Sequence, residues 1–306
     1  MVRRASEVSA VSDGLQPESP AWGRWGRDDE QGATNLIDAS TVLAATRAVT
    51  QGRVYPLAQP LGPGTPMPQH RKRPERYMAR DGGDYAAGAR RPGGFQFAED
   101  VVSFSSHSGT HVDALCHVWR DDLLYNGHPA SSVRSTTGAQ RCGVEKLPPV
   151  ATRGVLLDLG QDPEDYHDAR PFGAEDLEGA ANRAGVVITS GDAVLLYTGW
   201  MARAGADPAH YFATEPGLDV SGARWLADQG VALVGADNYA IEAQPSAPGT
   251  AFPVHQLLLR ECGIPVIENM VLDDLARAGV ATFFFLAAPI PLVGSTASPV
   301  APVAIV

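Results

Sequence analysis

Apolar runs of four to seven residues alternate with longer amphipathic segments in the C-terminal half of the chain. The apolar runs are rich in Val, Ile, Leu and Phe, and they predict strands at 154–159, 193–198, 231–235, 264–267, 281–287 and 300–306. The segments between them predict helices at 174–184, 222–229, 254–262 and 272–278. Strands that alternate with helices favour an α/β fold, in which the helices cover a sheet.

The N-terminal half is less regular. A helix is predicted at 39–49, with Asp38 or Ser40 as its N-cap and Gly52 just beyond its end, and a short strand at 53–59. Residues 60–94 are rich in Gly, Pro and charged residues and have little apolar periodicity. We expect them to be either disordered or part of a binding site. Residues 100–106 alternate between apolar and polar side chains and are rich in strand-forming residues, so they predict a strand that runs into a histidine-rich segment.

Neither an internal repeat nor a Gly-Ser linker divides the chain. We therefore expect a flexible N-terminal tail over residues 1–20, followed by one domain over residues 21–306. Gly and Pro together make up 56 of the 306 residues, about 18% against a typical ~12%. This excess predicts long ordered loops.

The chain is acidic, with a formal net charge of -11 and a sequence pI of about 5.1. Its single basic cluster, residues 71–73, is short and is followed by Pro and Glu, so no stripe of basic side chains suits nucleic acid. The most apolar stretch, 280–293, is interrupted by Thr and Pro and is shorter than a bilayer span. The chain is therefore expected to bind neither nucleic acid nor membranes. We also predict a cytoplasmic protein, because the three cysteines are scattered and the paired N-terminal arginines have no apolar run behind them.

The segment from Ser106 to His117 contains three of the eight histidines within eleven residues. His111 and Asp113 are two residues apart, so both point to the same side of an extended segment, and His107 can fold back across Gly109. Two imidazoles and a carboxylate form a ligand set that suits Zn²⁺ or Mn²⁺, and a carboxylate can bridge two ions. The sequence therefore predicts a site for one or two divalent metals.

His117 lies four residues beyond Asp113 and is either a further ligand or a free base. We favour the base, because an unligated imidazole has an ordinary pKa near 6.5 and can take or return a proton at neutral pH. Cys116 is a weak candidate for a nucleophile, since adjacent residues point apart in an extended chain. No nucleophile elbow, phosphate-binding loop or dinucleotide fingerprint is present in the sequence.

The stretch His107-x-Gly-Thr-His111-x-Asp113-x-x-x-His117 resembles the signature of the metal-dependent cyclase family, which includes bacterial kynurenine formamidases and isatin hydrolases. The resemblance extends over most of the chain from Trp22 onward. Leu115 stands where those enzymes typically have proline, and the region before the motif is longer than in the formamidases, which is typical of a longer member of the family.

The resemblance implies a swivelling β/β/α architecture, here a single domain with a mixed sheet and covering helices. It also implies a homodimer or homotetramer, a first metal on His107, His111 and Asp113, and His117 as the catalytic acid/base. The family's remaining ligands, a His at the head of a helix and a Glu beyond the following strand, resemble His255 and Glu268. The alternative for His255 is an ordinary helix residue.

Glu268 ends an apolar strand, where a buried carboxylate is costly unless it is paired or binds a metal; the alternative is a charge that reaches water. Asp237 and Glu242 follow another strand and are candidates for the substrate pocket or for a turn. Trp119 and Tyr125 lie close to the motif and are weaker candidates for walls of the pocket.

These features predict a metal-dependent hydrolase that opens a small, ring-bearing amide, cyclic amide or lactone with water activated by the metal. Two alternatives remain. The same site could catalyse a dehydration or ring closure, or the protein could bind a metal and a small molecule without turnover.

Overall fold

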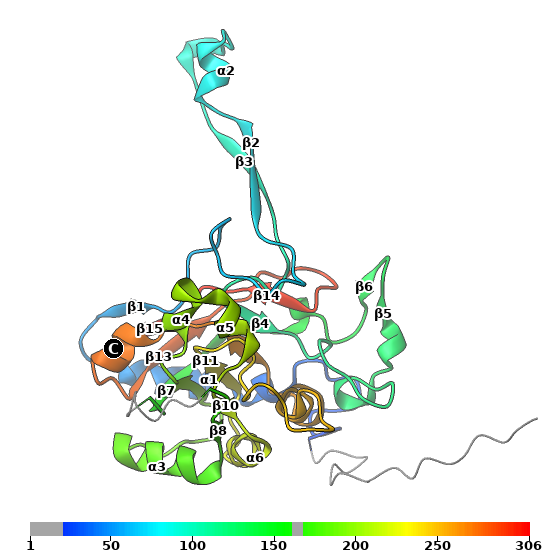
Figure 1. Ribbon diagram of the computed structural model, residues 1–306, viewed down its shortest axis with the longest axis vertical. Coiled ribbons are helices and arrows are strands. Elements are labelled where there is room, and N and C mark those ends of the chain that lie inside the picture. The colour runs from blue at the N-terminus through cyan, green and yellow to red at the C-terminus, as the bar shows by residue number, and fades with distance from the viewer. Residues whose placement is uncertain (1–20, 161–167) are drawn as a thin grey trace, which may run out of the picture.

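A mixed nine-stranded sheet forms the centre of the molecule in this computed structural model, which describes residues 21–160 and 168–306 (Figure 1). The tail predicted for residues 1–20 lies outside the described residues. The strand order is β1-β15-β13-β7-β9-β11-β12-β4-β14. These strands are β1 Val54–Pro56, β4 His111–Asp113, β7 Val150–Asp158, β9 Ala193–Tyr197, β11 Leu233–Ala236, β12 Val266–Glu268, β13 Thr282–Ala287, β14 Ala297–Pro299 and β15 Val303–Ile305.

The middle of the sheet is parallel and its two sides are antiparallel. β7, β9, β11 and β12 pair in parallel, with Val155 opposite Val194 and Leu157 opposite Leu196. β9 and β11 are apolar along nearly their whole length, as expected for parallel strands that are covered on both faces. The antiparallel pairs β13–β7, β12–β4 and β4–β14 complete a mixed sheet and confirm the predicted α/β class.

Helices fill the connections between the parallel strands. α3 (Ala174–Ala184) leads from β7 to β9, and α6 (Val220–Asp228) leads from β9 to β11; the two pack against each other below the sheet (Figure 1). The remaining helices are α1 Ala39–Ala45, α2 Gly82–Ala86, α4 Met201–Ala206, α5 Pro208–Ala213, α7 Pro253–His255 and α8 Asp273–Arg277, together with a π-helical turn, η8, over Gln256–Glu261. Short 3-10 turns occur at Gly32–Leu36, Thr46–Ala48, Pro92–Gly94, Tyr125–Gly127, Ala130–Ser132 and Val144–Lys146.

Most predicted elements are confirmed with shifted ends. α3 has the predicted limits, and α1 begins where Asp38 accepts a hydrogen bond from the Thr41 N–H at 2.8 Å. α1 is shorter than predicted, because its last turn is 3-10. The helix predicted at 254–262 is instead one α-turn followed by the π-turn, and α4 and α5 were not predicted.

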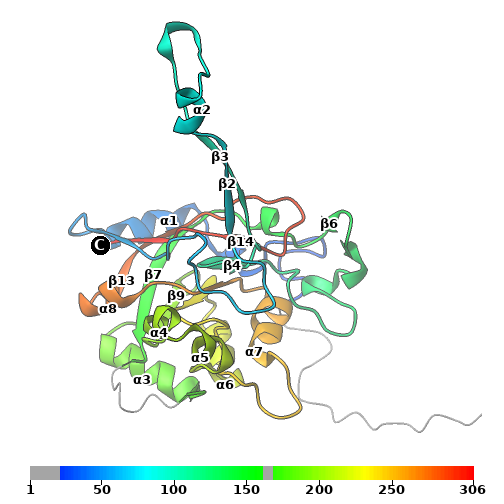
Figure 2. The same cartoon turned by 45° about the horizontal axis from the view of Figure 1, so that its top comes forward.

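Residues 60–94, expected to be either disordered or part of a binding site, contain β2 (Glu75–Arg80) and α2, and His70 and Arg71 line a cavity described below. β2 pairs with β3 (Glu99–Ser103) in a two-stranded ribbon that projects from the body (Figures 1 and 2). Both faces of this ribbon are exposed, so β2 has no alternation of apolar and polar residues that would have predicted a strand. Two further strand pairs are small: β5 (Val133–Arg134) with β6 (Gly138–Ala139), and β8 (Pro171–Phe172) with β10 (Gly217–Leu218).

No helix in residues 21–160 and 168–306 combines the length and the apolar character that crossing a membrane requires.

Candidate metal centre

Strand β4 carries the middle of the histidine-rich segment and lies between β12 and β14. In the antiparallel register Glu268 is opposite His111, and Val266 is opposite Asp113. His111 and Asp113 are two residues apart and leave the same face of the sheet, and a residue directly across from His111 shares that face. The register therefore brings two carboxylates, Asp113 and Glu268, to the His111 ring.

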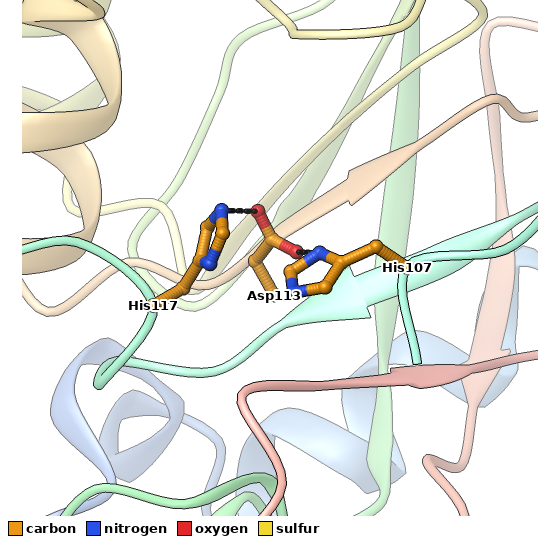
Figure 3. Close-up of side chains that lie close together, drawn as sticks. All are labelled: His107, Asp113 and His117. Carbon is orange, nitrogen blue, oxygen red and sulfur yellow. Dashed lines mark ion pairs between the residues drawn. The ribbon is translucent and has the colours of Figure 1, made fainter. Parts of the chain in front are cut away.

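His107 approaches the carboxylate of Asp113 from the turn before β4. Gly109 in this turn has a φ of +60°, a left-handed conformation that favours glycine. Nδ1 of His107 lies 2.8 Å from Oδ1 of Asp113 (Figure 3). On the other side, Nε2 of His117 lies 3.7 Å from Oδ2, so Asp113 sits between two imidazoles.

Glu268 links this group to His255, which is on the short helix α7. Oε2 of Glu268 lies 3.3 Å from Nε2 of His111, and Oε1 of Glu268 lies 3.0 Å from Nε2 of His255. His255 Nε2 is also 3.8 Å from Oδ2 of Asp113. The structure thus brings together all five residues predicted to bind metal: His107, His111, Asp113, His255 and Glu268.

Hydrogen bonds to acceptors outside the ligand group orient the rings of His111 and His255. Nδ1 of His111 donates to the Gly109 carbonyl at 2.9 Å, and Nδ1 of His255 donates to Oε1 of Glu242 at 2.7 Å. A carbonyl or carboxylate oxygen can only accept, so both Nδ1 atoms carry the proton. In the neutral rings, the Nε2 lone pairs then point at the carboxylates of the site. A neutral Nε2 can bind a cation through this lone pair, whereas a protonated Nε2 can donate to a carboxylate, as the 3.0 Å hydrogen bond between His255 and Oε1 of Glu268 allows.

Several buried atoms of the group have no hydrogen-bond partner within the described residues. These atoms are Nδ1 of His107, Nε2 of His111 and both carboxylate oxygens of Asp113. Nδ1 of His107 is close to Asp113, but the contact lacks hydrogen-bonding geometry. Buried polar atoms are normally paired, and four of the unpaired atoms gather on three side chains that the sequence predicts to bind metal. The donor set therefore fits a divalent cation with nitrogen and oxygen ligands.

Two groups of three side chains among the described residues each offer atoms that lie within 4.8 Å of one another and could hold a metal ion, and His255 belongs to neither group. One group is His107, Asp113 and His117, and the other is His111, Asp113 and Glu268. Because Asp113 belongs to both, the geometry accommodates one ion or two ions that share this carboxylate.

Electrostatics hold both acids of the site in the ionised form. Burial alone would raise the pKa of Asp113, but the surrounding imidazoles of His117, His107 and His111 lower it well below its usual value. Burial and the neighbouring Asp113 would raise the pKa of Glu268, yet His111 and His255 lower it to about 2. The site therefore presents two ionised carboxylates at neutral pH.

The pKa values of His255 and His111 are raised, whereas those of the two acids are lowered. Burial would lower the pKa of His255, but Glu242 and Glu268 raise it well above the usual value. Burial would likewise lower the pKa of His111, and Glu268 and Asp113 raise it. In the protein without metal, protons on these rings provide the positive charge that a divalent ion would otherwise supply.

His117 differs from the other histidines of the group. Its side chain is 29% exposed, whereas those of His111 and His255 are buried. Burial lowers the pKa of His117 to about 4, which keeps the ring neutral at pH 7. A neutral imidazole at the solvent side of the site can accept a proton.

The sequence of this chain matches the family model "Putative cyclase" over residues 32–243, which is more than half of its length. The chain belongs to the cyclase family. His107, His111, Asp113 and His117 lie inside the matched residues, whereas His255 and Glu268 lie beyond them.

Solved structures of related proteins share the fold of this cyclase-family chain. A crystal structure described as a novel cyclase is 31% identical, with 94% of this chain and 100% of the other chain covered and a TM-score of 0.87. Isatin hydrolase A from Ralstonia solanacearum is 23% identical, with 88% of this chain and 97% of the other covered and a TM-score of 0.64. At this lower identity, the likeness is one of fold.

A kynurenine formamidase from Bordetella petrii is 37% identical over 76 residues, which is 25% of this chain. The match spans only 33% of the length of that relative.

A cavity of about 460 Å³ opens beside the metal-ligand group of this cyclase-family protein. Two of the proposed ligands, His255 and Glu268, line it together with His117 and the predicted Trp119. The other lining residues are His70, Arg71, Val118, Tyr239, Ala240, Ala251, Phe252 and Gln256. A volume of this size accommodates a small organic molecule.

The other two predicted substrate residues lie elsewhere. Tyr125 is fully buried, and its hydroxyl donates to Oδ2 of Asp29 at 2.9 Å. Asp237 is fully buried, and its two oxygens accept hydrogen bonds from Thr198 and from the Gly199 N–H. Neither lines the cavity beside the ligand group, so a substrate role for Tyr125 or Asp237 stays a prediction.

Sequence reasoning did not assign the partners that surround the ligands. Glu242 follows the same strand as Asp237, but its pairing with His255 depends on how the 238–244 turn meets α7. Thr296 lies 3.1 Å from Nε2 of His107, a contact between residues 189 positions apart. Arg71 donates to the His107 carbonyl from within a loop that carries no motif. No local pattern identifies such contacts.

Proposed function

We propose that this protein is a metal-dependent hydrolase that opens a small amide, cyclic amide or lactone with water. The observation that carries the proposal is the convergence of two carboxylates and three imidazoles, among which Nδ1 of His107, Nε2 of His111 and both oxygens of Asp113 are buried without a hydrogen-bond partner. The names of the relatives, kynurenine formamidase and isatin hydrolase, agree with a hydrolytic reaction.

His107, His111, Asp113, His255 and Glu268 would hold the cation. A divalent ion supplies Lewis acidity there: it lowers the pKa of coordinated water from 15.7 to about 7 and polarises a carbonyl. Zn²⁺ and Mn²⁺ both suit this mixture of imidazole and carboxylate ligands. Glu242 accepts the Nδ1 proton of His255, which would leave Nε2 of that ring free to hold the cation.

His117 would manage the proton of the reaction. It faces the cavity and is neutral at pH 7, so it can take the proton from attacking water and return it to the leaving nitrogen or oxygen. Asp113, 3.7 Å from Nε2 of His117, stabilises the imidazolium that forms between these two steps.

The cavity favours a ring-bearing substrate. Trp119, Tyr239 and Phe252 supply aromatic walls, and Arg71 lies with its guanidinium 5.3 Å from the centre of the Tyr239 ring. Aromatic side chains offer flat apolar surface to a ring, and a cationic group near the mouth suits a carbonyl or carboxylate substituent.

The test begins with elemental analysis of the purified protein. The metal is then removed by chelation, and Zn²⁺ or Mn²⁺ is added back before assay on a panel of formanilides, isatins and lactones. We expect activity only with metal, and products that gain one water molecule by mass spectrometry. Products that lose water would indicate a cyclase or dehydratase. Full metal loading without turnover on the panel would favour a binding protein.

A further inference from the structure

A second cavity adjoins the one beside the metal-ligand group. It has a volume of about 550 Å³ and shares two lining residues, His70 and Tyr239, with the first cavity. We call it the outer compartment; it is lined by residues 67–70 and 73 of the loop before β2, by four residues of α5, and by Tyr239. None of these residues is a proposed metal ligand.

Tyr239 forms the boundary between the two cavities. Its ring centre lies 5.3 Å from the guanidinium carbon of Arg71, which lines the first cavity, and 5.0 Å from the ring centre of Phe212, which lines the outer compartment. The Tyr239 N–H donates to Oε2 of the buried Glu215 at 2.6 Å, which fixes the backbone at this boundary. A molecule that lies across the Tyr239 ring can therefore occupy both cavities at once.

Both walls of the outer compartment are held by internal hydrogen bonds. In the loop, the Arg71 N–H donates to the Pro68 carbonyl at 3.0 Å, and Met67 and Pro68 are buried. At the start of α5, the Asp207 side chain accepts a hydrogen bond from the His210 N–H at 3.1 Å. Preformed walls of this kind are typical of sites for small molecules.

The outer compartment combines apolar surface with one fixed positive charge. Phe212 and Tyr239 meet edge to face and offer aromatic surface. Arg73 is exposed, and its guanidinium makes no hydrogen bond or ion pair with any residue that the structure describes. Arg71, by contrast, donates to the His107 carbonyl. An unpaired guanidinium suits a carboxylate, which it can hold with two parallel hydrogen bonds.

The distribution of charge also favours an anionic ligand. The chain has a formal net charge of -11, yet the described residues that line the outer compartment include no Asp or Glu. Among those that line the first cavity, the single acid is Glu268, a proposed metal ligand. A cleft lined by one sign of charge raises the local concentration of ligands of the opposite sign. A cationic ligand would be repelled by Arg73, and a neutral one would leave its guanidinium unpaired.

We propose that the outer compartment is a second part of the substrate site and that the substrate has two parts. Its reacting carbonyl lies beside the metal ligands, and an apolar tail crosses Tyr239 and ends in a carboxylate held by Arg73. The reacting part rests on the proposed hydrolase function, whereas binding of the tail does not depend on turnover. Arg73 selects substrates by their tail and takes no part in the reaction.

The first experiment measures binding to the metal-loaded protein by isothermal titration calorimetry. The charged probe is an aniline with a para chain of three methylene groups that ends in a carboxylate, and the neutral probe ends in an alcohol instead. Neither probe has an acyl group that could be hydrolysed. We expect the wild type to bind the charged probe about five- to tenfold more tightly than the neutral one, and Arg73→Gln to lose this preference. The control is Arg76→Gln, which changes an exposed arginine of β2 that lines neither cavity and should keep the preference.

The second experiment fills the outer compartment. Ala209 is exposed on α5 and lines the compartment, so Ala209→Trp should occupy the place of the tail. We expect both probes to bind about tenfold more weakly, because the tail loses its apolar contacts. Ala202→Trp adds the same side chain at an exposed position of α4 outside both cavities and should bind the probes as wild type does. Far-ultraviolet circular dichroism checks that each variant is folded.

Equal binding of the two probes by the wild type, or a preference that survives in Arg73→Gln, would overturn the proposal. So would an Ala209→Trp protein that binds both probes as Ala202→Trp does. The formanilide counterparts of the probes test the hydrolase function separately. Selective binding without hydrolysis of these counterparts would support the outer compartment and count against the hydrolase alone. Hydrolysis of formanilide without selective binding of the probes would overturn the outer compartment alone.

Discussion

His111 and His255 each donate a ring N–H to an oxygen outside the ligand group, and their other nitrogens face Asp113 and Glu268. This placement suits a positive charge between each ring nitrogen and the carboxylates, which is a proton in the metal-free protein and would be a cation in the metal-bound one. The residues that set the orientation therefore matter as much as the ligands themselves.

His117→Ala is expected to separate proton transfer from metal binding. Loss of a positioned acid/base should lower turnover by about 10²- to 10⁴-fold, while the metal content stays unchanged. Elemental analysis and steady-state kinetics measure the two effects. His210→Ala on α5 serves as the control and should behave as wild type in both. An apo His117→Ala protein would show that His117 is a ligand.

Glu242→Gln is expected to weaken metal binding about 10- to 100-fold, because Glu242 accepts the Nδ1 proton of His255 and two backbone N–H groups at the start of α7. Competition with a metal-binding dye measures the affinity directly. Glu178→Gln removes an exposed carboxylate from α3 and should leave the affinity unchanged. Unaltered affinity in Glu242→Gln would mean that Glu268 alone orients His255.

At the scale of elements, three strands from distant parts of the chain form the site. β4 contains only three residues, and it is a strand because β12 and β14 supply hydrogen bonds on its two sides. In the same sheet, on the other side of β12, β9 and β11 are joined at their carboxyl ends by Asp237, which accepts hydrogen bonds from Thr198 and Gly199. These contacts give Asp237 a clear role in connecting two strands.

Asp237 should make stability depend on pH. Burial raises the pKa of Asp237 to about 7 from its usual 3.8. The folded chain therefore keeps a proton that the unfolded chain loses, so this contribution to stability is complete below pH 3.8 and is lost as the pH rises to about 7. The free energy of unfolding of Asp237→Asn, relative to wild type, should therefore rise by on the order of a few kcal/mol between pH 3.8 and about 7. Above this range the difference should stay constant.

Urea denaturation of chelated protein between pH 4 and pH 8 measures this difference. Glu178→Gln should follow wild type throughout. A difference between Asp237→Asn and wild type that is constant over the whole range would show that Asp237 is ionised in the folded protein at low pH.

At the scale of the whole molecule, the sheet places buried charge at one side of a largely apolar core. Asp113, Glu268 and Glu242 are buried there with the imidazoles of the site. Burying several ionisable groups is costly unless they are paired or bind a metal, so we expect folding and metal binding to be coupled.

Metal is therefore expected to stabilise the fold. At a free ion concentration about 100 times the dissociation constant, a ligand that binds only the folded state adds about 2.7 kcal/mol, which corresponds to several degrees in Tm. Calorimetry with chelator and with increasing Zn²⁺ or Mn²⁺ measures the effect. Asp113→Asn should show little of this increase. A Tm that is insensitive to metal in the wild type would argue against the ion site.

The sequence by itself determined the α/β class, most of the helices and strands, and the ligand candidates His107, His111 and Asp113. Local physics suffices for these, since apolar periodicity reports burial and residues two apart in a strand share a face. The sequence did not reveal the β2–β3 ribbon or helices α4 and α5, because the ribbon lacks a buried face and the helices are short.

Only the tertiary structure decided which distant groups meet. The resemblance to the cyclase family suggested His255 and Glu268. The pairing of β12 with β4 places Glu268 opposite His111, and the position of α7 places Nε2 of His255 3.8 Å from Oδ2 of Asp113. The contact of Glu242 with His255, and the separation of Tyr125 and Asp237 from the cavity, are likewise outcomes of packing. Sequence spacing constrains directions within one element, whereas strand register and loop packing set the distances between elements.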